Sequence, residues 1–294
     1  MNKIKELRDS LPTSNYAAII GANPSRGARS PLLWNAAFQG LGIDARMIAL
    51  DLGEMELPLA LSFLELDNNF IGGAVAAPYK EIIAKFIPDR LTTEAMQIGS
   101  VNCLFRRGGQ LHGTNTDGEA CVDRLESAAG SVEASRVLVL GAGGTGKSVA
   151  AFFAKKILDL RHLTITSRSD AGLTLSKKLG CNWIPWNVID QILPSVDILV
   201  NCTSVGSAPA QDSPVSRAQL RLLRHGALVY DVIYNPPETK LLKDARSVGL
   251  RVMNGSAMNL GQAVFGFSYA TGLRNNKASI ERVETLMALV LSKC

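Results

Sequence analysis

Glycines spaced for binding a phosphate group stand in the segment RVLVLGAGGTGKS, residues 136–148. A strand-like apolar run ends in these glycines, and an apolar helix pattern follows them. The backbone N–H groups and the helix dipole at such a helix start favour an anion. Gly141, Gly143 and Gly146 have the G-x-G-x-x-G spacing of a dinucleotide-binding loop.

The same loop also fits the G-x-x-x-x-G-K-S motif of P-loop nucleotide triphosphatases, which here ends in Lys147 and Ser148. A P-loop protein needs an acidic residue at the end of another strand to hold Mg²⁺. Asp231 is the one obvious candidate, because Asp197 precedes its predicted strand. The loop spacing alone therefore favours a dinucleotide only modestly.

The next predicted strand ends in SRSD, with Arg168 between Ser167 and Ser169. In a dinucleotide-binding fold this tip contacts the adenosine ribose, and an acidic residue there binds the ribose hydroxyls of NAD. An arginine flanked by hydroxyls suits the 2′-phosphate of NADP instead. Asp170 follows one step later and would still serve an NAD ribose. We therefore expect NADP, with NAD as the alternative.

The composition indicates a globular protein of one large or two ordinary domains. The chain has 294 residues, of which 47% are hydrophobic and 19% charged, and this excludes a disordered chain or a coiled coil. The net charge of +5 is scattered, without a basic tail or an aromatic-interleaved stripe, so we expect no nucleic-acid partner. A mildly basic balance suits an anionic cofactor or substrate.

The five cysteines are odd in number and have no C-x-x-C spacing, which indicates reduced thiols and a cytoplasmic protein. The opening residues MNKIKELRDSLPTSN are polar and lack the apolar core of a signal peptide. No apolar run approaches the roughly 18 residues of a membrane span. The three histidines are dispersed, and no His/Cys cluster has metal-ligand spacing. We expect neither a membrane nor a metal partner.

The first part of the chain alternates strand and helix patterns. Strands are predicted over residues 16–22, 45–52 and 69–76, and helical patterns over 31–42 and 54–65. Ser30 is predicted to be the N-cap of its helix, which has proline at the first position. Pro78 is predicted to open a helix through about Phe86, and Gly108-Gly109 to form a hairpin turn.

A second series of strands is predicted over residues 136–140, 162–166, 197–201, 227–232 and 250–253, with helices between them. Alternating strands and helices with nearly continuous apolar strands indicate a parallel sheet covered on both faces. The fold class is therefore α/β with a Rossmann doubly wound domain. Helical patterns over 256–272 and 278–292 would return to the first domain, because a Rossmann half is complete by about residue 253.

The chain resembles the shikimate/quinate dehydrogenase family over nearly its whole length. The matching segments occur in the family's order: NPSRGARSP (23–31), GGAVAAPYK (72–80), GSVNCL (99–104), GTNTDG (113–118), VLGAGGTGKS (139–148), SRS (167–169), NCTSVG (201–206), DVIYNPPETKLL (231–242) and NGSAMNLGQAVFGF (254–267). NTDG followed by a GAGG loop and Y-N-P-x-x-T-x-L-L is a specific combination. The resemblance makes the Lys147-Ser148 match coincidental.

The resemblance implies a two-domain NADP-dependent oxidoreductase of aromatic amino acid biosynthesis. It would reversibly reduce 3-dehydroshikimate to shikimate, or act on a closely related cyclic hydroxy acid. Residues 1–117 with 255–294 would form the substrate and catalytic domain, and residues 118–254 the NADP-binding Rossmann domain. We expect a monomer or a homodimer.

The family's catalytic pair corresponds to Lys80 and Asp117. As hydride leaves a carbinol, its O–H proton must leave too, and a lysine in a closed cleft can take that proton. A neighbouring carboxylate orients the amine. Taken alone, Lys80 would be a surface lysine and Asp117 a helix N-cap. The resemblance also implies that Asn102, Tyr234 and Gln262 contact the substrate.

The remaining site residues implied by the resemblance divide between substrate and cofactor. Ser30 and Arg29 are assigned to the substrate, although capping alone would explain a Ser-Pro pair. The cofactor residues are Gly141, Ala142, Gly143, Gly144, Thr145, Gly146, Ser167, Arg168, Ser169, Thr203, Val232 and Gly255.

The chain departs from the family pattern on the substrate side. The family's Ser-x-Ser-Pro is here Ala28-Arg29-Ser30-Pro31, and its Asn-Val-Thr has become Ala74-Val75-Ala76. Three polar groups are lost, each worth about 1.5–3 kcal/mol in a charge-assisted hydrogen bond. Unless Arg29 or Arg26 replaces them, we expect an altered substrate choice, such as quinate or a cyclitol-like compound with NAD(H). A non-catalytic nicotinamide-binding regulator is the alternative from another class.

Overall fold

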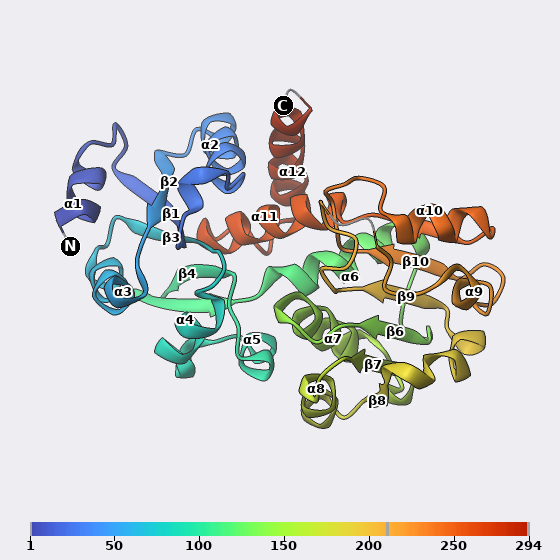
Figure 1. Cartoon of the computed structure of the whole chain (residues 1–294). Helices are drawn as coiled ribbons and strands as arrows, with labels where there is room; N and C mark the ends of the chain where they lie inside the picture. Colours follow the sequence, from blue (N-terminus) through green and yellow to red (C-terminus); the bar gives the residue numbers. More distant parts are fainter. Residues whose placement is uncertain (1, 210–211, 293–294) are drawn as a thin grey trace. The chain divides into compact units, whose positions relative to one another are not determined.

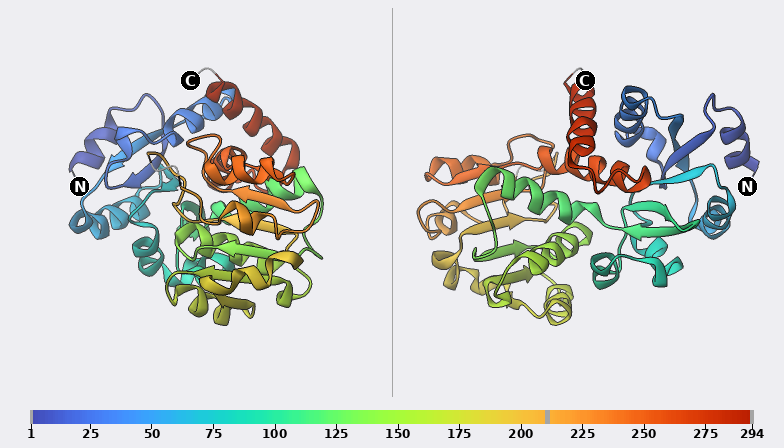
Figure 2. Two further views of the ribbon diagram at one scale, coloured as in Figure 1. Left: turned by 45° about the vertical axis from the view of Figure 1, so that its right-hand side comes forward. Right: turned by 180° about the vertical axis from the view of Figure 1, so that it is seen from behind.

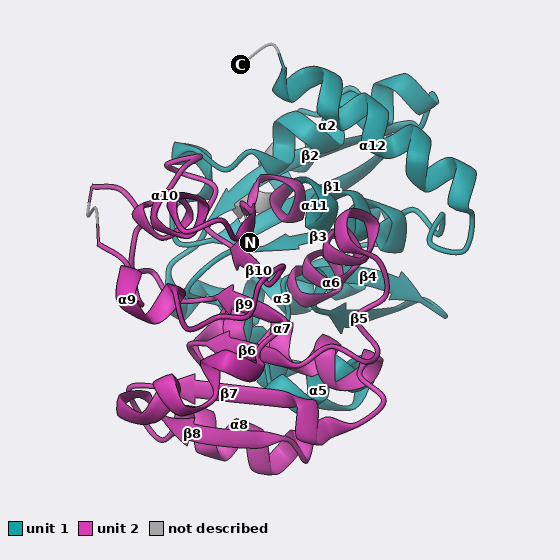
Figure 3. Ribbon diagram, turned by 90° about the vertical axis from the view of Figure 1, so that its right-hand side faces the viewer, with its two compact units in different colours: residues 1–116, 260–294 teal, residues 117–259 magenta. Residues whose placement is uncertain are grey.

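Helices and strands alternate along most of the chain in the computed structural model, which describes residues 2–209 and 212–292 (Figure 1). Figure 2 shows the same elements from two further sides. The chain divides into two compact units, drawn in different colours in Figure 3. Unit 1 comprises residues 1–116 and 260–294, and unit 2 comprises residues 117–259. Each unit has its own sheet and its own core.

Unit 1 is built on a five-stranded sheet with the order β2-β1-β3-β4-β5. Its strands are β1 (Asn15–Gly21), β2 (Ala45–Asp51), β3 (Phe70–Val75), β4 (Cys103–Arg107) and β5 (Gln110–Thr114). The first three are parallel, and β4 and β5 add an antiparallel hairpin. The hairpin turns at Gly108 and Gly109, with φ of 60° and 79°, a conformation that favours glycine.

Helices cover both faces of this sheet. They are α1 (Asn2–Asp9), α2 (Ser30–Leu41), α3 (Leu57–Leu66), α4 (Lys80–Phe86), α5 (Thr93–Ile98), most of α11 (Ser256–Ala270) and α12 (Lys277–Leu291). Alternate side chains of β1 enter opposite layers, because strand side chains have a period of two. Tyr16 and Ile20 pack with α3 and α4, whereas Ala17 packs with Trp34 of α2 and Phe267 of α11.

Two helix starts differ from the expected ones. α2 begins at Ser30 itself, with Arg29 as N-cap in helical conformation and no capping hydrogen bond from its side chain, so the predicted N-cap at Ser30 is wrong. α4 begins at Lys80 rather than Pro78. Tyr79 precedes it, and its buried hydroxyl donates to the carbonyl oxygen of Leu52 at 2.6 Å. This anchored side chain holds residues 77–79 in a turn before the helix starts.

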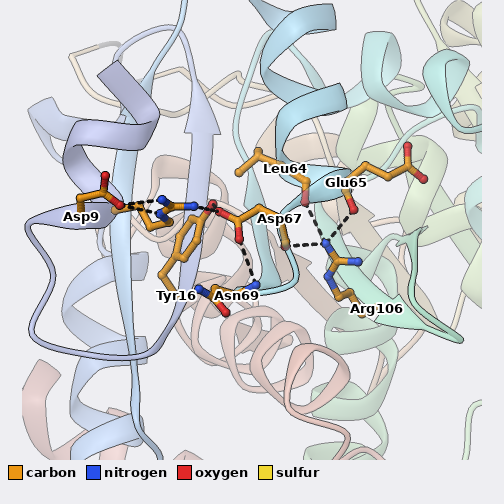
Figure 4. Close-up of polar contacts among 8 residues, drawn as sticks. Asp9, Tyr16, Leu64, Glu65, Asp67, Asn69 and Arg106 are labelled. Carbon is orange, nitrogen blue, oxygen red and sulfur yellow. Dashed lines mark hydrogen bonds and ion pairs between the residues drawn. The ribbon is translucent and has the colours of Figure 1, made fainter. Parts of the chain in front are cut away.

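The helix α1 was not predicted from the sequence, and a polar cluster holds it (Figure 4). Arg8 of α1 donates to the Asp67 carboxylate at 3.1 Å, and the Tyr16 hydroxyl donates to the same carboxylate at 3.0 Å. The Arg106 guanidinium donates to the carbonyl oxygens of Leu64, Glu65 and Asp67 at 2.9, 2.9 and 2.7 Å. Contacts distant in the sequence thus fix this helix.

Unit 2 has a six-stranded parallel sheet with the order β11-β10-β9-β6-β7-β8. Its strands are β6 (Val137–Leu140), β7 (Leu163–Ser167), β8 (Asn182–Pro185), β9 (Ile198–Asn201), β10 (Leu228–Asp231) and β11 (Arg251–Met253). Counted from β8, this is the 3-2-1-4-5-6 order of the Rossmann fold, as predicted. β8 was not predicted, because the short segment NWIP contains no buried apolar run.

Helices also cover both faces of the second sheet: α6 (Thr116–Ala129), α7 (Gly144–Lys156), α8 (Ala171–Leu179), α9 (Arg217–Leu220) and α10 (Lys240–Ser247). On one face, Leu138, Leu199 and Val229 of the central strands pack with Leu241 of α10. No helix among residues 2–209 and 212–292 is long and apolar enough to cross a membrane. Cys103, Cys121, Cys181 and Cys202 are free thiols, and Cys294 lies outside the described residues.

Candidate active site

The glycine loop of unit 2 connects β6 to α7. Gly141 has φ of 98°, and its N–H donates to the carbonyl oxygen of Thr166 at 2.8 Å. A Cβ at Gly146 would lie 2.1 Å from the Gly141 carbonyl oxygen, so the loop closes this tightly only with glycine there. A Cβ at Gly143 or Gly144 would meet no atom within 4 Å. The loop therefore leaves open space at the helix N-terminus, where a pyrophosphate fits.

A cavity of about 970 Å³ opens beside this loop, and its lining includes residues that follow β6, β7, β9 and β10. Most predicted cofactor residues line it, namely residues 141–145, residues 167–169, Thr203 and Val232. Tyr234, predicted for the substrate, lines it too. A cavity at the carboxyl ends of the strands of a Rossmann sheet is the expected position for a dinucleotide.

Two predicted cofactor residues, Gly146 and Gly255, do not line the cavity. Gly146 packs under the loop, and a Cβ at Gly255 would lie 1.9 Å from the carbonyl oxygen of Val232. At both positions, the absence of a side chain therefore allows two backbone segments behind the cavity lining to approach closely. Six lining residues were not predicted from the sequence: Trp186, Cys202, Ser204, Ser207, Ile233 and Asn235. Those that follow β9 and β10 could have been found from the strand ends, but Trp186 follows the unpredicted β8.

The side chains at the tip after β7 differ in their contacts. Ser167 is committed locally, because its hydroxyl donates to the Ser169 carbonyl oxygen at 2.5 Å and accepts the Gly172 N–H at 3.0 Å. Arg168 is exposed and lines the cavity. Asp170 is the N-cap residue of α8 and does not line the cavity. The charged side chain that this tip presents to the cavity is therefore a cation.

The P-loop alternative fails at Ser148 and Asp231, the two positions that would have to hold Mg²⁺. Ser148 is fully buried, and its hydroxyl accepts the N–H of Gly118 at 2.8 Å. Asp231 is buried as well, and its carboxylate accepts hydrogen bonds from Asn201, Ile233 and Thr239 at 3.0, 3.1 and 2.6 Å. Burial raises the pKa of Asp231, and these hydrogen bonds oppose the rise. Both side chains are therefore engaged in hydrogen bonds inside the protein.

The same carboxylate organises the loops beside the cavity. Asn201 bridges Asp231 to Thr203, because its Oδ1 accepts the Thr203 N–H at 3.0 Å and hydroxyl at 2.7 Å. This network joins the ends of β9 and β10. Cys202 also lines the cavity, and burial raises the pKa of its thiol well above the ordinary value.

In unit 1, hydrogen bonds connect the segments that carry Lys80, predicted for catalysis, and Asn102 and Gln262, predicted for the substrate. Lys80 is the first residue of α4, and its carbonyl oxygen accepts the Val101 N–H at 3.0 Å. The next residue, Asn102, is buried, and its Oδ1 accepts the Thr116 N–H at 2.8 Å. The Thr116 hydroxyl lies 3.0 Å from the carbonyl oxygen of Gln262. Asp117, the residue after Thr116, is buried in the first turn of α6 and is not its N-cap.

The departures from the family pattern lie at two kinds of position in unit 1. Ala74 packs against the core cluster of α2 and α11, so its methyl group has a structural role. Ala28 and Ala76 are half-buried, and neither belongs to the core clusters that contain Tyr16 or Trp34. The loop before Ala28 is tied to β2, because Ser25 donates its N–H and hydroxyl to the Asp51 carboxylate at 2.9 and 2.5 Å. The predicted Arg29 is exposed.

Comparisons with known proteins agree over most of the chain. Residues 19–104 match the family described as shikimate dehydrogenase substrate binding domain, and residues 123–239 match shikimate / quinate 5-dehydrogenase. The shikimate dehydrogenase (NADP(+)) of Alkaliphilus metalliredigens (strain QYMF) is 32% identical over 269 residues, covering 88% of this chain and 93% of that protein.

Two solved structures extend the comparison. Shikimate 5-dehydrogenase from Thermus thermophilus, in complex with NADP(H) and shikimate, aligns with a TM-score of 0.77 at 28% identity, covering 93% of this chain and 99% of that chain. The ligand-free 5-ketofructose reductase of Gluconobacter sp. strain CHM43 aligns with a TM-score of 0.78 at 26% identity, covering 94% and 99%. The architecture therefore accompanies more than one named activity.

Proposed function

The chain belongs to the shikimate dehydrogenase family, and from this premise we propose that it reversibly oxidises a ring hydroxyl of shikimate, or of a closely related cyclic hydroxy compound, with NADP⁺. The family is one of NADP-dependent oxidoreductases that act on CH–OH groups. The observation that carries the proposal for this chain is the cavity of about 970 Å³, in which the glycine loop, Arg168 and the loops after β9 and β10 meet.

The residues around this cavity suit NADP. Gly143 and Gly144 leave room for the pyrophosphate at the start of α7. Arg168 would pair with the 2′-phosphate, and Thr203 and Val232 would lie along the nicotinamide half. When bound, NADP⁺ supplies the hydride acceptor.

Lys80 and Asp117 would manage the proton of the reacting hydroxyl. The lysine Nζ would take the O–H proton as the carbinol carbon is oxidised, and would return it to the oxygen in the reverse direction. The Asp117 carboxylate would orient the ammonium and balance its charge. Burial of Asp117 supports this role, because a buried carboxylate needs a partner and interacts strongly with a nearby cation.

Four further side chains would hold the substrate. The Nδ2 group of Asn102 would donate to a ring hydroxyl, since its Oδ1 already accepts from Thr116. Gln262 and Tyr234 would contact the ring near the nicotinamide. Ser30 is the first residue of α2 and not its N-cap, so capping does not explain the serine, which supports its assignment to the substrate. Arg29 would supply a cation for an anionic substituent.

Substrate choice is the point at which we expect this chain to differ from its relatives. Half-buried alanines stand at positions 28 and 76, where the family pattern has hydroxyl groups. Loss of each charge-assisted hydrogen bond would weaken carboxylate binding by about 1.5–3 kcal/mol. The likeness to a 5-ketofructose reductase favours a second candidate, a polyhydroxylated ketone without a carboxylate.

The deciding experiment measures reduction of NADP⁺ and NAD⁺ with shikimate and with quinate, and oxidation of NADPH with 5-ketofructose. The Lys80→Ala and Asp117→Asn variants control for contaminating activity. Fast, Lys80-dependent turnover of shikimate with NADP⁺ would establish the first candidate. Lys80-dependent turnover of 5-ketofructose alone would establish the second. Tight NADPH binding without turnover of any substrate would favour a regulatory protein and overturn the proposal.

A revertant series tests the substrate argument directly. Ala28→Ser and Ala76→Thr restore the family's hydroxyls, and we expect the double variant to lower KM for shikimate by about tenfold or more. Ala74→Asn is the matched control. Ala74 packs against the core, so this variant should lower the stability of the protein without improving KM for shikimate. We further propose a cytoplasmic monomer or homodimer, in which unit 1 binds the substrate and unit 2 binds NADP.

A further inference from the structure

A buried hydrogen bond joins the two helices of unit 2 on which the proposed reaction depends. The hydroxyl of Ser148, in α7, accepts the backbone N–H of Gly118, in α6, at 2.8 Å. Ser148 is fully buried, and Gly118 is buried as well. Ser148 belongs to the P-loop-like part of the glycine motif, which the dinucleotide assignment leaves without a role.

The two helices touch closely at this point. A Cβ on Gly118 would lie 2.2 Å from the carbonyl oxygen of Ser148 and 2.7 Å from its Oγ. Such distances are shorter than any van der Waals contact, so the backbone of α6 approaches α7 only because residue 118 has no side chain. Both the close approach of the two backbones and the hydrogen bond therefore define this contact.

Each end of this bond lies close to a functional group. Ser148 is the fifth residue of α7, whose N-terminus lines the cavity through Gly144 and Thr145. Gly118 follows Asp117 directly. The first four N–H groups of a helix have no partner within that helix. In α6, the Thr116 N–H is satisfied by Asn102 and the Gly118 N–H by Ser148, so side chains distant in sequence hold both neighbours of Asp117.

We propose that Ser148 is a positioning residue: through Gly118 it fixes the first turn of α6, and hence the Asp117 carboxylate, relative to the phosphate-binding end of α7. This inference rests on the proposed function, because it assigns Asp117 to the reacting hydroxyl. Removal of the Ser148 hydroxyl leaves a buried N–H without its acceptor, which is unfavourable enough to shift the helix turn.

The test compares Ser148→Ala with Ser148→Thr, which keeps a hydroxyl. Ser176→Ala is the matched control, because Ser176 is also a buried helical serine of unit 2, and its hydroxyl donates to a carbonyl within α8. For Ser148→Ala we expect amide exchange in the first turn of α6 to rise about tenfold or more, and kcat to fall by a similar factor. The NADPH dissociation constant should change by less than about threefold, and the pH profile of kcat should shift.

Ser148→Thr should restore part of kcat, and Ser176→Ala should leave both the exchange and the pH profile unchanged. Unchanged exchange in α6 for Ser148→Ala would overturn the inference, whatever the activity. The inference would also be overturned if kcat of Ser148→Ala fell without a change in its pH profile, and if Ser176→Ala showed the same fall in kcat at an equal loss of stability. If the wild-type chain turns over no substrate, the proposed function fails, and the exchange measurement still decides whether Ser148 holds α6.

Discussion

The amide oxygen of Asn102 accepts the backbone N–H of Thr116 at 2.8 Å, and the Thr116 hydroxyl lies 3.2 Å from the same oxygen. Asn102 is 4% exposed, and Thr116 is fully buried. Thr116 is the first residue of α6 and directly precedes Asp117. Asn102 therefore has a structural role at the start of this helix, in addition to the substrate contact proposed for its Nδ2 group.

Two substitutions of Asn102 separate these roles. Asn102→Ala removes both, and should lower the free energy of unfolding by about 1–3 kcal/mol, because a buried N–H loses its acceptor. Asn102→Asp keeps an acceptor at a helix N-terminus, where a negative charge is favourable, and should remain close to wild type in stability. Both variants should raise KM. Urea unfolding and steady-state kinetics measure the two effects, and equal destabilisation by both variants would contradict this division.

Arg168 should decide the preference for NADP over NAD. Arg168→Ala removes the cation that we pair with the 2′-phosphate, a contact worth about 1.5–3 kcal/mol. We expect KM for NADP⁺ to rise by about 10- to 150-fold, whereas KM for NAD⁺, which lacks this phosphate, should change little. Raised salt should screen the attraction between Arg168 and the 2′-phosphate, so it should also reduce the wild-type preference for NADP⁺. A parallel loss of both cofactors would place Arg168 outside the 2′-phosphate site.

Two glycines of the phosphate loop should respond in opposite ways to substitution by alanine. A Cβ at residue 146 would lie 2.1 Å from the Gly141 carbonyl oxygen, whereas one at residue 144 would meet no atom within 4 Å. Gly146→Ala should therefore destabilise unit 2. Gly144→Ala should fold at least as well as wild type, since alanine is favoured over glycine in a helix by up to about 1 kcal/mol.

Gly144→Ala should nevertheless have a functional defect. In Gly144→Ala, the new methyl group would occupy space proposed for the pyrophosphate, so NADPH binding should weaken while thermal stability is kept. Thermal unfolding and NADPH fluorescence titration distinguish the two effects. Wild-type NADPH affinity in Gly144→Ala would show that the pyrophosphate does not lie against this residue.

The alternation of strands and helices could be predicted because each central strand carries a continuous apolar run, such as Val137–Leu140, that only a sheet covered on both faces would bury. Elements held by distant contacts could not. The ion pair of Arg8 with Asp67 tethers α1, and neither residue shows a local signal for it. β8 was missed for a related reason, because its side chains are half-buried or exposed.

The candidate site shows the same division. The glycine spacing predicted the phosphate loop, because a position where two backbone segments approach closely requires glycine. Trp186 lines the cavity, but it follows a strand without a sequence signal. Asn102 and Ser148 each hold an N–H of α6, and such a partnership across the sequence leaves no mark in the spacing of either residue.

The buried carboxyl group of Asp231 makes the free energy of unfolding depend on pH. Burial raises its pKa above the ordinary value of 3.8, and the hydrogen bonds from Thr239, Ile233 and Asn201 oppose this rise. Because the folded pKa is higher than the unfolded one, the folded protein binds more protons between these two values. The contribution of Asp231 to the free energy of unfolding therefore falls as pH rises through this window, and becomes constant above it.

Thr239→Val should enlarge this pH dependence. The Thr239 hydroxyl donates to the Asp231 carboxylate at 2.6 Å and also accepts the Leu242 N–H as the N-cap of α10. Loss of the cap should cost about 1 kcal/mol at every pH. Loss of the bond to the carboxylate disfavours the ionised form, so the folded pKa of Asp231 rises further. The stability gap between wild type and Thr239→Val should then widen by about 1.5–3 kcal/mol as pH increases through that pKa.

Urea unfolding of both proteins at intervals between about pH 4 and about pH 8 measures this gap. Thr239→Ser keeps the hydroxyl and should follow the wild-type curve. The valine variant should also bind NADPH more weakly at the upper end of the range, because the ionised Asp231 holds the ends of β9 and β10 beside the cavity. A gap that is the same at every pH would mean that Thr239 serves only as a helix cap, and that the charge of Asp231 does not depend on it.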